Sequence, residues 1–207
     1  MTIAMETRVA GQIDPTGSTE GRRWATNDPG WPEELFQRIF LENYSRLAGV
    51  LFRIVGDYSR AEDLAIESFW RLYRQPYGGG CEVNPSGWLY RTATRLGIDS
   101  LRAEARRGRY EHEAGVGTRE RGEPDPLEGV LGRERRMQVR KVLASLRPEQ
   151  AQLLILRASG FSYQELAGAL GVKTGSVGTM LTRAEAAFRN RYVRAYGKQG
   201  DGNKEEL

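Results

Sequence analysis

The chain of 207 residues is poor in the residues that form disulfide bonds and metal sites: it has one cysteine, Cys81, and one histidine, His112. A single cysteine excludes an intrachain disulfide, and one cysteine with one histidine cannot form a clustered zinc site. No stretch approaches the roughly eighteen apolar residues of a membrane span, and the N-terminus lacks a basic-then-apolar signal pattern. We therefore expect a cytoplasmic protein with no membrane segment, metal or cofactor.

Catalytic arrangements are equally scarce. No nucleophile and base, and no pair of carboxylates in a shared pocket, can be assembled from these residue types, so we expect no enzymatic activity. Residues 75–86 form a predicted loop around the glycine triplet 78–80. That loop lacks the Gly-Lys-Ser/Thr ending of a phosphate-binding loop, so we interpret the glycines as a source of flexibility.

A large excess of charge of one sign is also missing, because the formal net charge is only +4. A nucleic-acid surface must then come from local concentration of basic residues. Residues 88–109 carry six arginines against two acids, and residues 171–196 carry five basic residues against one acid. Arginine suits both phosphate contact and stacking on unpaired bases. Since charge runs are usually just solvated faces, the charge indicates nucleic-acid binding only together with a motif.

Helical periodicity without strand alternation runs through residues 33–109. A long amphipathic helix is predicted from Glu33 to Val55 and is ended by Gly56-Asp57. Ser59 and Glu62 form a candidate capping box for a second helix that reaches about Arg74. A third helix opens at Pro85. The sequence thus predicts an all-α fold.

The C-terminal stretch predicts three short helices separated by tight turns. One begins at Pro148, a capping box of Ser162 and Glu165 starts the next, and Gly171 turns the chain into a third near Thr174. This pattern is typical of a helix-turn-helix, whose last helix places its N-terminal residues near base edges in the major groove. The candidate DNA contacts are Lys173, Thr174, Ser176, Thr179, Met180 and Arg183. For Arg183 there is an alternative to DNA contact, which is a structural role in holding the recognition helix.

Composition divides the chain into five predicted segments. Residues 1–32 form a flexible arm, in which Trp31 is a candidate for docking on the body of the protein. Residues 33–109 form an N-terminal helical domain, and residues 110–132, with six acids against two arginines, form a flexible acidic linker. Residues 133–196 form the helix-turn-helix domain, and residues 197–207 form a disordered tail.

Three stretches, in this order, resemble bacterial sigma factors of the extracytoplasmic-function type of the sigma-70 family. They are GDYSRAEDLAIESFWRLY at 56–73, PSGWLYRTATRLGIDSLR at 85–102, and LRPEQAQLLILRASGFSYQELAGALGVKTGSVGTMLTRAEAAFR at 146–189. The resemblance implies two small helical domains joined by a linker, and a factor that directs promoter recognition and transcription initiation. Its implied partners are core RNA polymerase and promoter DNA, and an anti-sigma factor is left open as a third.

The resemblance also implies roles for residues by position. The second helix would dock on the clamp coiled coil of the largest polymerase subunit through Glu62, Asp63, Glu67 and Trp70. The third helix would face the unpaired promoter bases, and the candidate contacts on it and its continuing basic face are Arg91, Thr94, Arg95, Asp99, Arg102 and Arg106. The last helix would read the more distant duplex element. The acidic linker resembles the segment that runs through the polymerase between the two domains.

Three positions depart from the family pattern. Ile66 replaces a common Gln, Arg95 replaces a common Asn, and Gly178 replaces a usual Lys. These departures suggest an unusual promoter preference or a diverged, weakly active factor. The alternatives are a sigma-like decoy or polymerase-binding regulator that does not open DNA, and an ordinary helix-turn-helix regulator. A response regulator would need an alternating strand-helix receiver domain, and residues 33–109 show no strand period.

Overall fold

The computed structural model describes residues 30–113 and 130–197, and in these ranges the chain is all-helical. The elements are α1 (Glu33–Val55), α2 (Tyr58–Tyr73), a 3-10 turn η1 (Cys81–Val83), α3 (Pro85–Glu113), α4 (Val130–Ser145), α5 (Pro148–Ala158), α6 (Tyr163–Leu170) and α7 (Thr174–Tyr196). The predicted all-α fold is confirmed. None of these helices combines the length and the apolar character that crossing a membrane requires. Most of the predicted arm, linker and tail lies outside the described residues.

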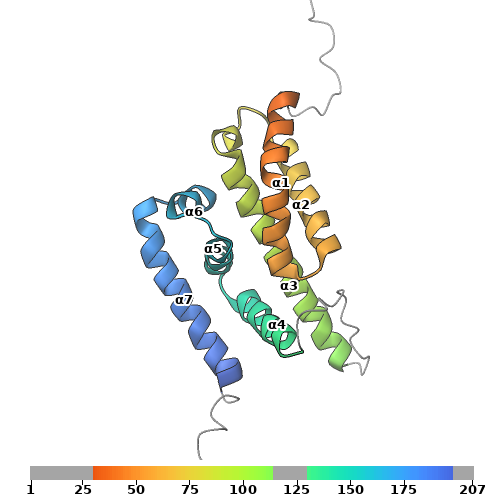
Figure 1. Ribbon diagram of the computed structural model, residues 1–207, viewed down its shortest axis with the longest axis vertical. Helices are drawn as coiled ribbons and strands as arrows, with labels where there is room; N and C mark the ends of the chain where they lie inside the picture. Colours follow the sequence, from red (N-terminus) through yellow and green to blue (C-terminus); the bar gives the residue numbers. More distant parts are fainter. Residues whose placement is uncertain (1–29, 114–129, 198–207) are drawn as a thin grey trace, which may run out of the picture.

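Helices α1, α2 and α3 pack side by side as the N-terminal unit (Figure 1). Leu47 and Leu51 of α1 are fully buried, as is Leu72 of α2. Gly97 lies where α3 crosses α1, and a Cβ there would stand 2.9 Å from Ile54 Cδ1 and 3.2 Å from Leu51 Cδ2. The missing side chain therefore lets the two helices approach closely.

The N-terminus of α2 differs from its prediction. Gly56 ends α1 in the left-handed region at φ 75°, which leaves Asp57 extended as the N-cap. Its carboxylate Oδ1 accepts from the backbone N of Arg60 at 2.7 Å. The predicted capping box of Ser59 and Glu62 is therefore wrong, because Ser59 already lies inside the first turn.

We expect Asp57→Ala to lower the free energy of unfolding by about 1 kcal/mol, because it removes the side-chain acceptor that caps this helix. Urea denaturation followed by circular dichroism measures the change. Ser59→Ala is the matched control and should leave the stability nearly unchanged, since Ser59 is exposed. Equal losses for the two variants would contradict the assignment of the cap.

Helices α4 to α7 form the C-terminal unit, and its local signals behave as the sequence predicts. Pro148 opens α5, and Ser162 and Glu165 form the capping box of α6. Gly171 ends α6 in the left-handed region at φ 69°, and α7 begins at Thr174. The predicted starts of all three helices are thus confirmed.

Two helix ends near the predicted linker lie elsewhere than predicted. Helix α3 continues four residues beyond Arg109 to Glu113, and α4 begins at Val130 rather than Arg133. Alanine, glutamate and arginine dominate residues 103–113, and these are good helix formers even where the charge turns acidic. The acidic composition alone therefore did not mark the helix end. Residues 114–129 lie outside the described ranges.

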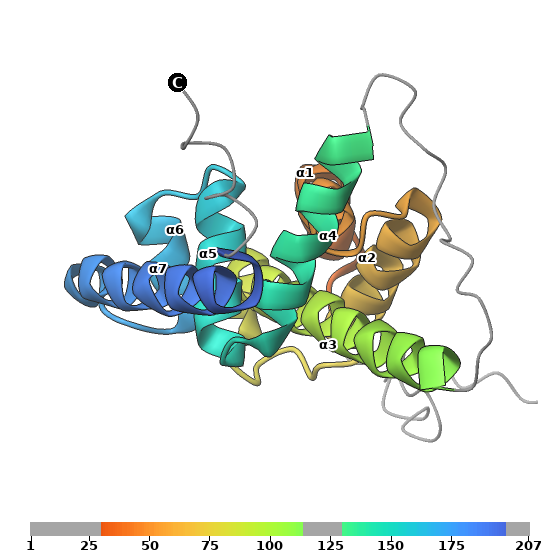
Figure 2. The ribbon, with the colours of Figure 1, turned by 90° about the horizontal axis from the view of Figure 1, so that it is seen from below.

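The two units pack on each other and share one hydrophobic core in this structure. Helix α3 contacts α4, α5 and α6, and α1 contacts α5. Helix α7 lies at the far side of the C-terminal unit from α2 in both views (Figures 1 and 2). The helix predicted to carry the recognition residues is thus the most remote from the N-terminal unit.

Trp31 docks on the body of the protein, as one interpretation of the sequence predicted. Its side chain is 6% exposed, and its indole Nε1 donates to the carbonyl of Gln75 at 2.8 Å. Its ring meets the edges of Phe36 and Tyr77 at centroid distances of 6.2 and 5.3 Å. These contacts fix the entry of the chain into α1, so the ordered body begins before residue 33.

Candidate partner and nucleic-acid interfaces

One face of α2 carries the residues predicted to bind a protein partner. We call it the α2 face, and its members are Glu62, Asp63, Ile66, Glu67 and Trp70. Their spacings of three and four bring the side chains to one side of the helix. Asp63, Ile66 and Trp70 are exposed, whereas the two glutamates are half-buried. The predicted acids and Trp70 therefore lie together, with Ile66 among them.

The α2 face combines acidic and apolar side chains. Ile66 and Trp70 are 50% and 54% exposed, and the Trp70 ring stacks on Tyr73 with centroids 6.0 Å apart. Glu67 Oε1 accepts from Arg71 Nε at 2.8 Å. Such an exposed ion pair contributes little to stability and can be given up to a partner. Exposed tryptophan is frequent among the residues that dominate binding energy at interfaces, so this face suits a protein partner.

The basic face of α3 contains both free and engaged side chains. Arg95 and Arg106 are exposed and make no hydrogen bond or ion pair within the described residues. Asp99 is also exposed, and its Oδ1 lies 3.8 Å from Nη1 of Arg102. Arg95, Asp99 and Arg106 are thus available to a nucleic acid in the arrangement that the structure shows.

Other predicted contacts on α3 are occupied by the C-terminal unit. Thr94 is fully buried, which corrects its expected place on the surface. Its hydroxyl donates to the carbonyl of Tyr90 at 2.6 Å and accepts from Gln152 Nε2 at 3.0 Å, because α5 covers this part of α3. Arg91 and Arg102 donate to backbone carbonyls of the C-terminal unit. The expected DNA surface is therefore partly covered within the chain.

A second contact between the units centres on Arg46 and was missed in the sequence. Its Nη1 lies 2.7 Å from Oε1 of Glu165, and its guanidinium stacks 3.8 Å above the Phe161 ring centroid. The hydrogen bond from Arg46, and then the backbone N–H of Ser162, lower the pKa of Glu165 to about 2. In the sequence Glu165 was identified only as part of a capping box, and that pattern does not predict its ion pair with Arg46.

The N-terminal part of α7 presents most of its predicted recognition residues to solvent. The exposed ones are Lys173, Thr174, Ser176, Thr179 and Arg183. Met180 differs, because it is half-buried and packs against the core beside Leu181. Within the described residues Arg183 makes no hydrogen bond or ion pair, so the expected structural role finds no support. A Cβ at Gly178 would meet only Tyr163 at 3.8 Å, so the position has room for a side chain.

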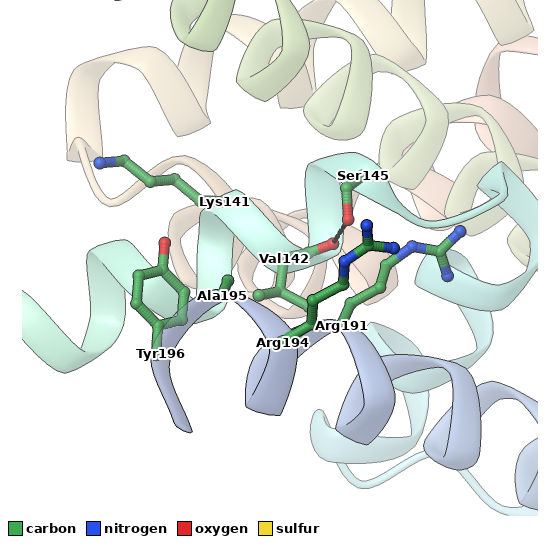
Figure 3. A pocket seen from close by; sticks show the side chains of 7 residues that line it. All are labelled: Lys141, Val142, Ser145, Arg191, Arg194, Ala195 and Tyr196. Carbon is green, nitrogen blue, oxygen red and sulfur yellow. Dashed lines mark hydrogen bonds between the residues drawn. The ribbon is translucent and has the colours of Figure 1, made fainter. Parts of the chain in front are cut away.

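A basic groove lies between α4 and the C-terminal part of α7, with a volume of about 460 Å³ (Figure 3). Its lining residues are Lys141, Val142, Ser145, Arg191, Arg194, Ala195 and Tyr196. Figure 3 shows the side chains of Arg191 and Arg194 extending toward Ser145, whose hydroxyl donates to the Val142 carbonyl at 2.7 Å. The groove therefore places positive charge at the C-terminal end of α7, whereas the predicted recognition residues lie at its N-terminal end.

Comparison with known proteins gives matches to both units. The family described as Sigma-70 region 2 matches residues 39–107, and Sigma-70 region 4 matches residues 136–188. The chain is 31% identical to the ECF RNA polymerase sigma factor SigE of Mycolicibacterium smegmatis over 187 residues, which are 86% of this chain and 68% of that protein. It is 28% identical to SigL of Mycobacterium tuberculosis over 158 residues, 75% of this chain and 87% of that protein.

A solved structure is similar as well. It is the co-crystal structure of the sigma factor RpoE in complex with the anti-sigma factor NepR from Bartonella quintana. The similarity has a TM-score of 0.47 at 22% sequence identity, and it covers 78% of this chain and 98% of that chain.

Proposed function

Since this chain belongs to the extracytoplasmic-function sigma factors of the sigma-70 family, we propose that three of its surfaces divide the work of initiation between them. The chain binds core RNA polymerase and directs promoter recognition and transcription initiation, as sigma factors do. In our proposal the α2 face contacts the polymerase clamp, the basic face of α3 contacts unpaired promoter bases, and α7 reads the upstream duplex. The observation that carries this division is that each surface lies within a matched sigma region and presents exposed side chains of suitable chemistry.

The assignment of the α2 face rests on its mixture of carboxylates and exposed apolar rings. Asp63 and Glu67 offer negative charge to a basic partner, which steers association and fixes its register. Ile66 and Trp70 supply apolar area that loses water on contact. The departure at Ile66 thus adds an apolar contact where the family commonly has a polar amide.

The assignment of α7 rests on position and exposure. Lys173 is the N-cap of α7, and Thr174 and Ser176 lie in its first turn, the part of a recognition helix that approaches base edges. Arg183 lies further along the exposed side, where it can reach a phosphate. The half-buried Met180 serves this helix by packing on the core rather than by reading bases.

Reconstituted transcription tests the proposal. Purified chain is added to core polymerase, and transcripts from DNA of the source organism are mapped by their 5′ ends. Initiation at a defined set of promoters that core polymerase alone does not use is the expected result. Binding to core polymerase without any new transcript would indicate a decoy, and stimulation of transcripts that depend on another sigma factor would indicate an ordinary regulator.

The binding of duplex promoter DNA is expected to fall steeply as salt rises, because basic side chains displace condensed counterions. Combined Lys173→Ala and Arg183→Ala should weaken binding and reduce the slope of log affinity against log salt by about 1 for each phosphate contact that is lost. Fluorescence anisotropy across a salt series measures both quantities. The control is Arg38→Ala with Arg74→Ala, which removes two exposed arginines far from α7 in the sequence. An unchanged slope in the α7 variant would exclude phosphate contact by these residues.

A further inference from the structure

Figure 1 shows the N-terminal end of α1 beside the C-terminal end of α2, and a pocket of about 540 Å³ lies at these two ends. Its volume is within the range of ordinary ligand pockets, about 300–1,000 Å³. Of the six described residues that line it, four are aromatic and none is basic; they are Trp31, Glu33, Phe36, Gln37, Phe40 and Tyr73. The pocket therefore combines aromatic walls with a single carboxylate.

The aromatic walls are held in place by the packing of the N-terminal unit. The rings of Phe36 and Tyr73 meet edge to face, with centroids 5.1 Å apart and an interplanar angle of 69°. The ring of Phe40 lies 4.6 Å from that of Phe69, which is 3% exposed and belongs to the core. Trp31 is nearly buried, whereas the other three lining rings are half-buried and keep part of their surface for a ligand. Such a preformed site loses little conformational freedom when it binds.

The carboxylate of the pocket has no cationic partner. Glu33 is exposed, and within the described residues it makes no hydrogen bond or ion pair. An acid in the first turn of a helix is ordinary, since it offsets the positive end of the helix dipole, and Glu34 beside it has the same effect. Glu33 differs from Glu34 because it also lines the aromatic pocket. A carboxylate beside aromatic rings favours a cation, because the negative faces of the rings and the full charge attract in the same direction.

The pocket is continuous with the α2 face. Tyr73, which lines the pocket, stacks on Trp70 of that face, with centroids 6.0 Å apart and ring planes 23° apart. Asp63 and Glu67 of the α2 face are acidic as Glu33 is, so both surfaces suit one basic partner. A protein that covers Trp70 therefore comes within reach of the pocket.

We propose that the pocket receives an arginine side chain of the core polymerase subunit that docks on the α2 face. The planar guanidinium stacks on the half-buried rings, and it loses its water more readily than an ammonium does. Glu33, at the exposed edge of the pocket, pairs with its N–H donors. The polymerase interface thus extends from α2 to the start of α1. This inference rests on the proposed function of the α2 face.

Glu33→Lys tests the pocket, and Glu34→Lys is its matched control. Both glutamates are exposed in the first turn of α1, so the two variants change the net charge and the helix dipole alike, but only Glu33 lines the pocket. Binding of the full chain to purified core polymerase is measured by fluorescence anisotropy with a dye at the N-terminus. Glu33→Lys should weaken binding about tenfold, as expected from losing a cation–π contact and an ion pair, and Glu34→Lys by less than about twofold. Equal losses would overturn the pocket, because they would show a general effect of charge.

Two substitutions of Tyr73 test the aromatic contact by itself. Tyr73→Phe keeps the ring and should bind polymerase as the parent does. Tyr73→Leu keeps apolar volume but removes the ring, and it should weaken binding about fivefold. Thermal melting followed by circular dichroism checks that both variants are folded. Equal binding of the two folded variants would overturn the contact between the rings and a guanidinium.

A photo-crosslinker in the pocket identifies the occupant. Gln37→p-benzoylphenylalanine is suitable because Gln37 is exposed and lines the pocket, and the same substitution at Arg38, which is exposed but does not line it, is the control. The Gln37 product, mapped by mass spectrometry, should join polymerase within a few residues of an arginine. Changing that arginine to alanine should weaken the parent but should weaken Glu33→Lys no further. Additive losses, or a crosslink remote from any arginine, would overturn the assignment of the occupant.

The failure of the pocket and the failure of the proposed function give different results. If the charge reversal of Asp63 and Glu67 abolishes polymerase binding while Glu33→Lys leaves it unchanged, the pocket fails and the α2 face stands. If the parent itself does not bind core polymerase, both fail.

Discussion

Asp63→Arg combined with Glu67→Arg is expected to abolish association with core RNA polymerase, with a loss of affinity of at least about 100-fold. Reversing two charges on a complementary surface replaces attraction by like-charge repulsion, which costs several kcal/mol at an interface. The isolated protein should remain folded, because Asp63 is exposed and the ion pair of Glu67 with Arg71 is exposed as well. Pull-down of purified core polymerase by the tagged chain measures the loss, and circular dichroism reports the fold.

The control for this experiment is Glu149→Arg with Glu185→Arg, which changes the net charge by the same amount on α5 and α7. Both positions are exposed. The control variant should bind core polymerase as the parent does in the absence of DNA. Retention of full binding by the Asp63 and Glu67 variant would remove the α2 face from the polymerase interface and would leave the sigma-factor assignment without a contact surface on this helix.

Arg95→Asn is expected to change which promoters the polymerase opens. Arg95 is exposed on α3 and makes no hydrogen bond or ion pair within the described residues, unlike Arg91 and Arg102. Its guanidinium is therefore free to stack on an unpaired base or to pair with the edge of a guanine. The variant restores the amide that the family commonly has at this position. We expect a change in discrimination of about 1–3 kcal/mol at one promoter position, or about 5- to 150-fold.

A promoter library randomised at the unpaired bases, with transcripts counted by sequencing, measures this preference for the parent and the variant. Arg106→Asn is the matched control, since Arg106 is also exposed on α3 but lies three turns further along the helix. It should lower output evenly across the library. A uniform loss of output for Arg95→Asn, with the base preference unchanged, would mean that Arg95 meets a phosphate and does not specify sequence.

The helices of this fold could be predicted because their signals are local. Pro148, the pair Ser162 and Glu165, and Gly171 each determine a helix end through contacts within a few residues. The start of α2 was harder, because Asp57 and Ser59 are both good capping residues. In the structure Gly56 ends α1 in the left-handed region and Asp57 follows it directly as the extended N-cap, a choice between two capping residues that residue type alone does not make.

The contacts between the two units could not be predicted, because their partners are far apart in the sequence. Arg46 and Glu165 are separated by 119 positions, and Thr94 and Gln152 by 58. The sequence correctly predicted basic residues along α3. It could not distinguish an arginine that binds the end of another helix from one that is free to bind a phosphate, because both have the same helical spacing. For the same reason the sequence did not show that Thr94 is buried in this structure, and its role as a DNA contact stays a prediction, whereas the α2 face needed only helical spacing.

The exposed ring of Trp70 gives the protein a built-in optical probe. The described tryptophans occupy three environments: Trp31 is 6% exposed, Trp88 is half-buried against the core, and Trp70 is 54% exposed on the α2 face. An indole that leaves water for a protein interface emits at shorter wavelength. Excitation of a chain carrying Trp24→Phe should therefore give a blue shift from Trp70 when polymerase lacking its own tryptophans docks there. The emission wavelength of Trp31 should stay unchanged until the protein unfolds. Binding and unfolding can therefore be followed in the same sample without an added label.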